Sequence, residues 1–157
     1  MTSDIQPYPN LSDDEIRDLN LLVEMIIPES DEYGLPGAGD EQIFQDILAA
    51  TEPYRSTISV ALKALNTIVL KTGQSGFVDL PIAQQEQAIV AFREQRASDC
   101  ELLEALTVQC YYRDERVKRS LDMDIRPPFP GGFELEQGDW SLLDHVKTST
   151  PFFRDAS

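Results

Sequence analysis

Histidine and cysteine are scarce in this sequence, which holds one histidine and two cysteines among 157 residues. A metal centre with two or more imidazole ligands is therefore excluded, and a Ser-His-Asp triad would depend on His145 alone. We interpret His145 as a surface or interface residue. Cys100 and Cys110 are too few for a disulfide framework and lack the clustered spacing of a zinc or iron–sulfur site. We expect both to be small core residues.

Basic residues and long apolar runs are also in short supply. The chain has 13 basic residues against 28 acidic ones, a formal net charge of −15. Such a field repels phosphates and anionic lipids, so nucleic-acid binding and polybasic attachment to membranes are both disfavoured. No apolar run approaches the roughly 18 residues that a membrane-spanning helix needs, so we expect no direct membrane insertion. The partner of such a chain is expected to be a protein.

The charges are unevenly distributed along the chain. Residues 1–50 hold 12 of the acidic residues and Arg17 as their only base. A segment of this kind forms a solvated surface or, less often, a docking surface for a basic partner. One basic concentration follows much later in the chain, and we expect it to pair with the acidic first third or with an acidic patch on a partner. Its members are Arg113, Arg116, Lys118, Arg119 and Arg126.

Apolar residues recur at helical spacing through most of the first 125 residues, which predicts an all-α fold, a compact bundle of about five or six helices. Ser12 and Glu15 form a capping-box pattern, so a first helix is predicted over 12–27, and Pro28 ends it. Asp40 is expected to cap the second helix. The two glycines in the stretch 37–39 are a feature of phosphate-binding loops, but no predicted strand precedes them. We interpret this stretch as a turn that lets the first two helices fold back on each other.

Four further helices are predicted. The third runs from Pro53 to Gly73, the fourth begins at Pro81, the fifth is capped by Ser98 with Glu101 in a second capping box, and the sixth covers 114–121. The residues expected to face inward are Ile43, Phe44, Ile47, Leu48, Ile58, Leu62, Leu65, Val69, Ile82, Ile89, Phe92, Leu102, Leu103, Leu106 and Cys110.

The composition and the hydrophobic pattern of the sequence change after Asp124. The proline- and glycine-rich stretch 126–133 cannot continue a helix, and residues 135–157 show no sustained period. We predict that residues 1–125 form the helical domain and residues 126–157 an extended, aromatic- and proline-rich C-terminal arm that binds a partner and orders on it. The aromatic residues of this arm are Phe129, Phe133, Trp140, Phe152 and Phe153.

Two smaller features leave alternatives open. The pair Tyr111-Tyr112 at the end of the fifth helix would bury apolar area and offer two hydroxyl groups, either in the core or in an interface. The carboxylate pairs at 13–14 and 31–32 do not follow the spacing of a calcium loop, and we interpret them as surface residues.

Several stretches together resemble one known family. They are Met25-Ile26-Ile27-Pro28 with the acidic Glu29-Ser30-Asp31, then Pro36-Gly37-Ala38-Gly39-Asp40, Leu106-Thr107, Tyr111-Tyr112 and Pro128-Phe129-Pro130-Gly131-Gly132-Phe133. From about Leu11 to Phe133 the chain is similar to the small subunit, called subunit 3, of gluconate 2-dehydrogenase-type flavoprotein complexes. These motifs are structural rather than catalytic.

The resemblance implies a partner that carries the chemistry. In this family the large subunit belongs to the glucose-methanol-choline (GMC) oxidoreductase class, binds FAD and oxidises a sugar, sugar acid or polyol. The small subunit is implied to hold no cofactor of its own and to stabilise or mature the large one in a hetero-oligomer. It commonly supplies a twin-arginine export signal, which the start of this sequence lacks. We therefore expect a cytoplasmic protein, or a periplasmic one if a signal was removed or if the chain is exported with its partner.

The leading hypothesis is therefore a non-catalytic accessory subunit, with no catalytic, cofactor-binding or metal-binding residue of its own. Its partner-binding residues would be Tyr111, Tyr112, Phe129, Phe133, Trp140, Phe152 and Phe153, because buried aromatic side chains dominate interface energetics. The alternative is a transient helical assembly chaperone or adaptor without stable membership of a complex. A third hypothesis, an enzyme, would need a site built on Tyr111, Tyr112, His145 and a carboxylate.

Overall fold

The structure is a computed structural model that describes residues 11–71, 73–74, 76–125, 132 and 138–144. The chain divides into two units, Met1–Ile125 and Arg126–Ser157, and each is described by itself. Every regular element in the described residues is a helix, and one isolated β-bridge joins Ser30 to Leu35. The predicted all-α bundle is confirmed.

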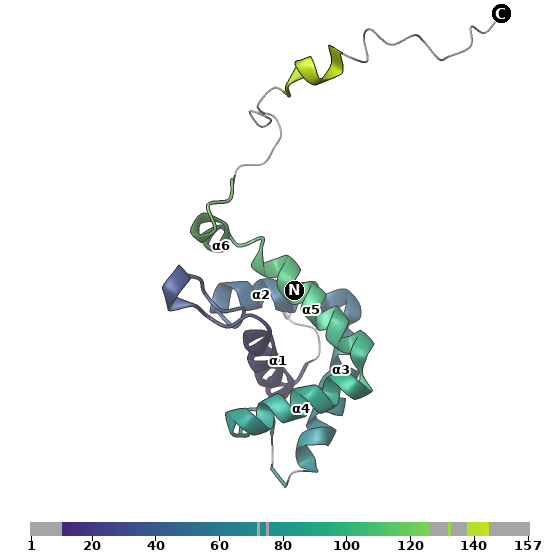
Figure 1. Cartoon of the computed structure of the whole chain (residues 1–157). Coiled ribbons are helices and arrows are strands. Elements are labelled where there is room, and N and C mark those ends of the chain that lie inside the picture. Colours follow the sequence, from purple (N-terminus) through teal and green to yellow (C-terminus); the bar gives the residue numbers. More distant parts are fainter. Residues whose placement is uncertain (1–10, 72, 75, 126–131, 133–137, 145–157) are drawn as a thin grey trace, which may run out of the picture. The chain divides into compact units, whose positions relative to one another are not determined.

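The described part of the first unit contains six α-helices and two short 3-10 helices (Figure 1). In chain order they are α1 (Asp13–Ile26), η1 (Asp31–Tyr33), α2 (Glu41–Ala50), η2 (Glu52–Tyr54), α3 (Arg55–Leu70), α4 (Ile82–Gln95), α5 (Ala97–Tyr111) and α6 (Glu115–Ser120). None of the described helices is both long enough and apolar enough to cross a membrane.

Three of the predicted helix starts are confirmed by their caps. Ser12 accepts the N–H of Glu15, and the Glu15 carboxylate accepts the N–H of Ser12 in return, which completes the capping box of α1. Asp40 and Asp114 cap α2 and α6 by accepting backbone N–H groups of the first turn. Each such cap is worth about 1 kcal/mol, because it satisfies donors that have no partner within the helix.

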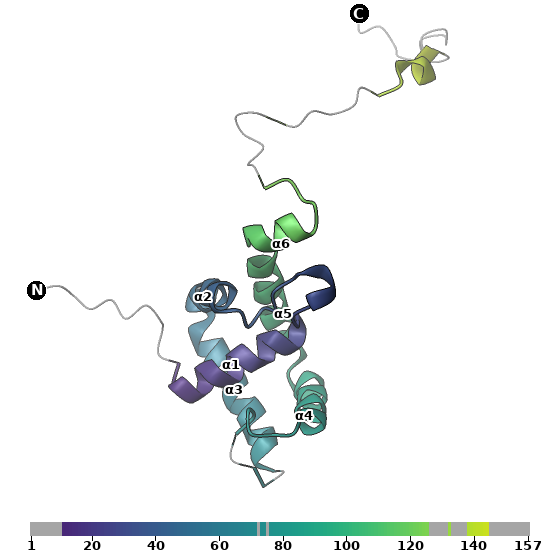
Figure 2. The same cartoon turned by 90° about the vertical axis from the view of Figure 1, so that its left-hand side faces the viewer.

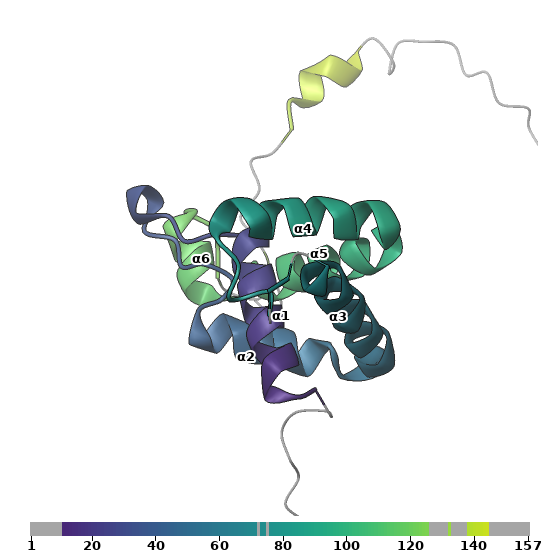
Figure 3. The same ribbon diagram turned by 90° about the horizontal axis from the view of Figure 1, so that it is seen from below.

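Helix α5 is the central element of the first unit, since it contacts α1, α2, α3 and α4. Helix α3 in turn packs on α1 and α4. The views from the side and from below show α1 passing between α2 and α4 (Figures 2 and 3). The core lies between these five helices. Its largest fully buried side chains are Leu19, Val23, Ile43, Ile47, Leu48, Ile58, Leu62, Leu65, Val69, Phe77, Phe92 and Leu103.

The predicted inward face of the fourth helix was wrong at its start. Ile82 is 72% exposed, whereas Gln85, Ala88 and Phe92 are the buried residues of α4. The buried Gln85 side chain donates to the carbonyl of Phe77 at 3.5 Å, so a polar residue belongs to the inward face. The prediction took only apolar residues into account and therefore assigned Ile82 to the inward face in place of Gln85.

The boundaries of two other helices also differ from the prediction. Pro53 lies in η2, and α3 begins at Arg55. Helix α5 begins at Ala97 with Arg96 as its cap residue, so the predicted capping box at Ser98 is wrong. The carbonyl of Arg96 already accepts the N–H groups of Asp99 and Cys100, which places Ser98 inside the first turn. Arg96 is thus the one residue between α4 and α5.

The second unit is described mainly at residues 138–144. There a short 3-10 helix, η3 (Trp140–Leu143), is capped by Asp139, whose carboxylate accepts the N–H of Ser141. Trp140 is 62% exposed, and Leu142 is exposed as well. The partner-binding role of residues 126–157 stays a prediction.

Candidate partner-binding surface

The loop that joins α1 to α2 is held against α1 by one carboxylate. Glu24, near the end of α1, accepts the N–H of Gly39 with Oε2 at 2.8 Å and the N–H of Glu29 with Oε1 at 3.1 Å. Asn20, one turn earlier, donates its side-chain amide to the carbonyl of Gly39 at 3.1 Å. Both ends of the loop are therefore fixed to the same helix.

Gly37 and Gly39 leave the room that Glu24 occupies. A Cβ atom on Gly37 would lie 2.2 Å from Glu24 Oε2, and one on Gly39 would lie 2.8 Å from the same atom. Neither glycine has a positive φ, so the close approach of the carboxylate, and not the backbone conformation, requires glycine here. A phosphate beside these glycines would meet the negative charge of Glu24. The stretch is the turn that the sequence indicated.

Tyr111 ties the same loop to α5. Its hydroxyl group donates to the carbonyl of Pro36 at 2.9 Å, and its side chain is buried. Burial, together with the neighbouring Tyr112, raises the pKa of Tyr111, so the hydroxyl group stays protonated as a donor. Tyr112 packs edge-on against Tyr111, with ring centroids 5.4 Å apart, and is 47% exposed. The structure thus places Tyr111 in the core and Tyr112 on the surface.

Arg116 joins the N-terminal caps of α2 and α6. Its Nη2 atom donates to Asp40 Oδ1 at 2.6 Å and to Asp114 Oδ2 at 2.9 Å. These hydrogen bonds hold the pKa of both Asp40 and Asp114 below the usual range, and they raise the pKa of Arg116. The expected pairing of the basic cluster with the acidic first third of the chain is confirmed at Arg116.

Helix α6 lies beside η1 in all three views (Figures 1, 2 and 3). The Ser120 hydroxyl group donates to the carbonyl of Gly34 at 3.1 Å, and Gly34 ends η1 with a φ of 60°. Asp122 follows α6 with a φ of 54°, and the N–H of Met123 returns to the carbonyl of Lys118 at 2.9 Å. This is the pattern of a Schellman C-cap, and it turns the chain sharply at the end of α6.

Exposed apolar side chains occur both in η1 and in the residues that directly follow α6. Tyr33 is 64% exposed, and Leu121, Met123 and Ile125 are each exposed as well. The carboxylates at 29, 31 and 32, on either side of Ser30 and next to Tyr33, are exposed, and within the part of the chain that the structure describes their side chains form neither a hydrogen bond nor an ion pair. Apolar side chains with a polar border are typical of protein-binding surfaces.

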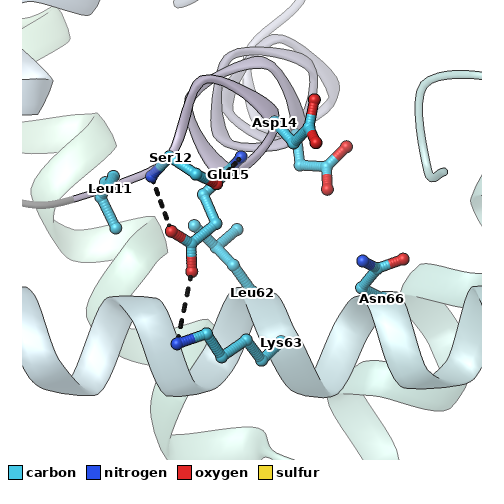
Figure 4. Close-up of a pocket in the computed structure, with 8 residues that line it drawn as sticks. Leu11, Ser12, Asp14, Glu15, Leu62, Lys63 and Asn66 are labelled. Carbon is cyan, nitrogen blue, oxygen red and sulfur yellow. Dashed lines mark hydrogen bonds and ion pairs between the residues drawn. The ribbon is translucent and has the colours of Figure 1, made fainter.

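A separate hollow of about 600 Å³ lies at the first turn of α1, beside α3 (Figure 4). Glu15 there accepts the Ser59 hydroxyl group at 2.8 Å and faces Lys63 at 4.0 Å. Burial alone would raise the pKa of Glu15, but hydrogen bonds from Ser12 and Ser59 and the charge of Lys63 outweigh it and lower the pKa. Glu15 is therefore a structural anion that keeps its charge at neutral pH.

Asp18 lines the same hollow, and its pKa is shifted in the opposite direction. Burial and the nearby Asp14 raise the pKa of Asp18, while the N–H of Val78 works against them. Asn66 lines the hollow too, and its buried Oδ1 atom has no hydrogen-bond partner among the residues that the structure describes. Within the described ranges, no group of three or more His, Cys, Asp or Glu side chains is arranged to hold a metal ion.

Three of the seven predicted partner-binding residues lie within the described ranges. Tyr112 and Trp140 are exposed, and Tyr111 is buried in the loop anchor. Phe129, Phe133, Phe152 and Phe153 lie outside the described residues, as does His145. Cys100 and Cys110 are buried on α5, as expected, and burial raises the pKa of both thiols.

Tyr33, the exposed aromatic residue of the junction, was not among the predicted partner-binding residues. An aromatic residue between two acids and a glycine in a turn-rich loop was the signal that could have found it. Leu121 and Met123 were missed as well, because a six-residue helix shows too little periodicity to indicate which face is exposed. The role of Glu24 could not be read from the sequence, since it depends on a contact across a loop.

Comparison with known proteins adds one match. The family model described as gluconate 2-dehydrogenase subunit 3 matches residues 13–131, well over half of the chain. Neither the curated proteins nor the solved structures contain a match to the chain. The matched range includes α1 to α6 and every hydrogen bond of the loop anchor described above.

Proposed function

Because this chain belongs to the gluconate 2-dehydrogenase subunit 3 family, we propose that it is the non-catalytic small subunit of a dehydrogenase complex. Its partner is an FAD-dependent large subunit of the GMC class that oxidises a sugar, sugar acid or polyol. The small subunit binds this partner and stabilises or matures it. FAD belongs to the partner, and this chain contributes no cofactor.

The junction of η1 and α6 is the observation that carries this proposal. The residues around this junction lie within the range that the family model matches, and they form a fixed surface. Glu24, Tyr111 and Arg116 hold the α1–α2 loop in place. That loop displays Tyr33 to solvent. A fixed, exposed apolar surface on a small acidic helical protein is suited to binding another protein.

The proposal is tested by purifying the tagged full-length chain from its native host and recording the visible spectrum of the eluate. We expect a yellow eluate that contains a second, flavin-bearing chain in fixed ratio. If the chain elutes alone and colourless from cells shown to contain the flavoprotein, it is not a stable subunit. That result would favour the transient assembly chaperone.

A second measurement addresses stabilisation. The large subunit is expressed with and without this chain, and its soluble amount, bound flavin and dehydrogenase activity are compared. Loss of soluble, flavin-loaded large subunit in the absence of this chain is the expected result. Equal yield and flavin content in both cultures would contradict a stabilising or maturing role.

A further inference from the structure

We propose that the surface formed by η1 and the end of α6 is the primary docking site for the large subunit, and that it takes an apolar patch bordered by lysine or arginine side chains. We call this surface the η1–α6 face and define it by Glu29, Asp31, Glu32, Tyr33, Leu121 and Met123. The inference rests on the proposed function, because it names where and by what chemistry the partner is bound.

The face is held rigid before any partner arrives. The bridge between Ser30 and Leu35 closes the turn with two backbone hydrogen bonds of 2.9 and 3.0 Å. The Ser120 hydroxyl group then fixes the carbonyl of Gly34 to α6. Tyr33 precedes Gly34 and Leu121 follows Ser120 in the chain, so this bond keeps the two backbone segments that carry these side chains close together. A surface that is already ordered loses less conformational entropy on binding.

The apolar members of the face are large and remain in contact with water. Tyr33 is 64% exposed, and Leu121 and Met123 are exposed too, although the first unit has a well-formed core. Tyrosine combines a large apolar ring with a hydroxyl group and is enriched among residues that dominate binding energy. Covering Tyr33 would therefore supply much of the affinity.

The acidic residues of the face favour a partner whose binding surface is positively charged. Glu29, Asp31 and Glu32 are exposed, and their side chains have no basic partner among the described residues. An apolar patch bordered by basic side chains would satisfy them. Nucleic acid and anionic membranes would be repelled by the same carboxylates.

A second copy of this chain is also a poor occupant of the face. A two-fold symmetric dimer brings the same patch of both copies together, so the carboxylates of one copy would lie across from a face that carries the same negative charges. Like charges placed opposite each other oppose association. The large subunit is the occupant that the charge of the face favours.

The first test compares two tyrosines in similar settings. Tyr33 ends η1 and Tyr54 ends η2, and both are exposed. Full-length Tyr33→Ala and Tyr54→Ala each compete with the tagged, unchanged protein for the flavin-bearing chain in the purified complex, and the displacement gives the dissociation constant of each variant. We expect Tyr33→Ala to raise the dissociation constant at least tenfold and Tyr54→Ala to change it less than threefold. Equal dissociation constants for the two variants would overturn the inference.

The second test reverses charge at matched positions. Asp31→Lys/Glu32→Lys changes the face, and Glu86→Lys/Glu94→Lys makes the same change of charge on exposed sites of α4. The first variant should slow association at low salt by more than tenfold, with a difference that shrinks at high salt, while the α4 variant keeps most of the unchanged rate. Equal slowing in both variants would mean that only net charge matters, which would overturn the inference.

The outcomes separate this inference from the function on which it rests. If the unchanged chain binds no flavin-bearing chain, both the proposed function and the docking site fail. If it binds and Tyr33→Ala binds equally well, the function stands and the η1–α6 face is not the docking site. A dimer of the isolated chain that Tyr33→Ala abolishes would assign the face to a second copy and overturn the inference.

Discussion

Replacing Gly37 with alanine tests whether the glycines of the α1–α2 loop are required by Glu24. A Cβ at this position would lie 2.2 Å from one carboxylate oxygen of Glu24 and 2.3 Å from the other. The backbone of Gly37 does not have a positive φ, so alanine introduces no conformational strain of its own. The carboxylate would have to leave, and with it the hydrogen bonds from Gly39 and Glu29.

The size of the effect follows from those two hydrogen bonds. A bond to a charged acceptor contributes about 1.5–3 kcal/mol when it is buried, and the bond from Glu29 is exposed and contributes less. Glu24→Ala should therefore lower the free energy of unfolding by about 2–3 kcal/mol. Gly37→Ala should cost nearly as much, reduced by the roughly 0.4–1 kcal/mol that alanine gains by restricting the unfolded chain.

The two changes should not add. Once Glu24 is alanine, the methyl group at position 37 meets no carboxylate, so Gly37→Ala should become neutral or stabilising by up to about 1 kcal/mol. Gly39→Ala is the matched control. Its Cβ would also lie 3.1 Å from the Cβ of Glu24, which alanine retains. It should stay destabilising in both backgrounds.

The assay is urea unfolding followed by circular dichroism, carried out on the unchanged protein, the three single variants and the two double variants. The interaction free energy between positions 24 and 37 is calculated from the four proteins of that cycle. If Gly37→Ala costs the same with and without the Glu24 carboxylate, the reasoning is refuted, and the glycine is needed for some other reason.

Three further predictions concern single side chains. Tyr111→Phe removes the hydrogen bond to Pro36 and should lower the free energy of unfolding by about 0.5–1.5 kcal/mol in the same urea assay, and an unchanged value would contradict the anchor. Asp18→Asn keeps an acceptor for the backbone N–H and removes a charge whose pKa is raised by burial, so the Tm should rise at pH 7, with the gain vanishing at acid pH where Asp18 is protonated. Arg116→Gln should cost about 1 kcal/mol at pH 7. Because Arg116 lowers the pKa of Asp40, this stabilisation is present above about pH 4 and is lost as the pH falls through the lowered value, so a cost that does not shrink as the pH is lowered below about 4 would contradict the ion pair.

The parts of the fold that the sequence predicted are those set by neighbours in the chain. The caps at Ser12, Asp40 and Asp114 are local hydrogen bonds, and residue type at fixed spacing identifies them. The start of α5 was missed because Ser98 and Glu101 also fit a capping pattern, while the helix already begins at Ala97. The carbonyl of Arg96 accepts the N–H groups of Asp99 and Cys100, so Ser98 lies inside the first turn and does not cap the helix.

The candidate surface was harder to predict, since it depends on contacts between distant residues. The sequence indicated that the basic cluster could pair with the acidic first third, and Arg116 does so with Asp40. It named Tyr111 among the partner-binding residues and left a core position open as well, because only the carbonyl of Pro36, 75 residues away, decides that the residue is buried. Tyr33 carries no periodic signal, and its exposure is a property of the assembled junction.

The hydrogen bonds that position the α1–α2 loop also determine when it can take its final shape during synthesis. They join residues 75, 76 and 86 positions apart in the chain. At about 5–20 residues per second, a ribosome needs roughly 4–17 seconds to extend the chain from the loop to Ser120. Until Ser120 has left the ribosome, Gly34 lacks its bond to α6. The η1–α6 face is therefore completed only after the chain has been made as far as Ser120, so the docking that we propose comes well after the synthesis of the loop itself.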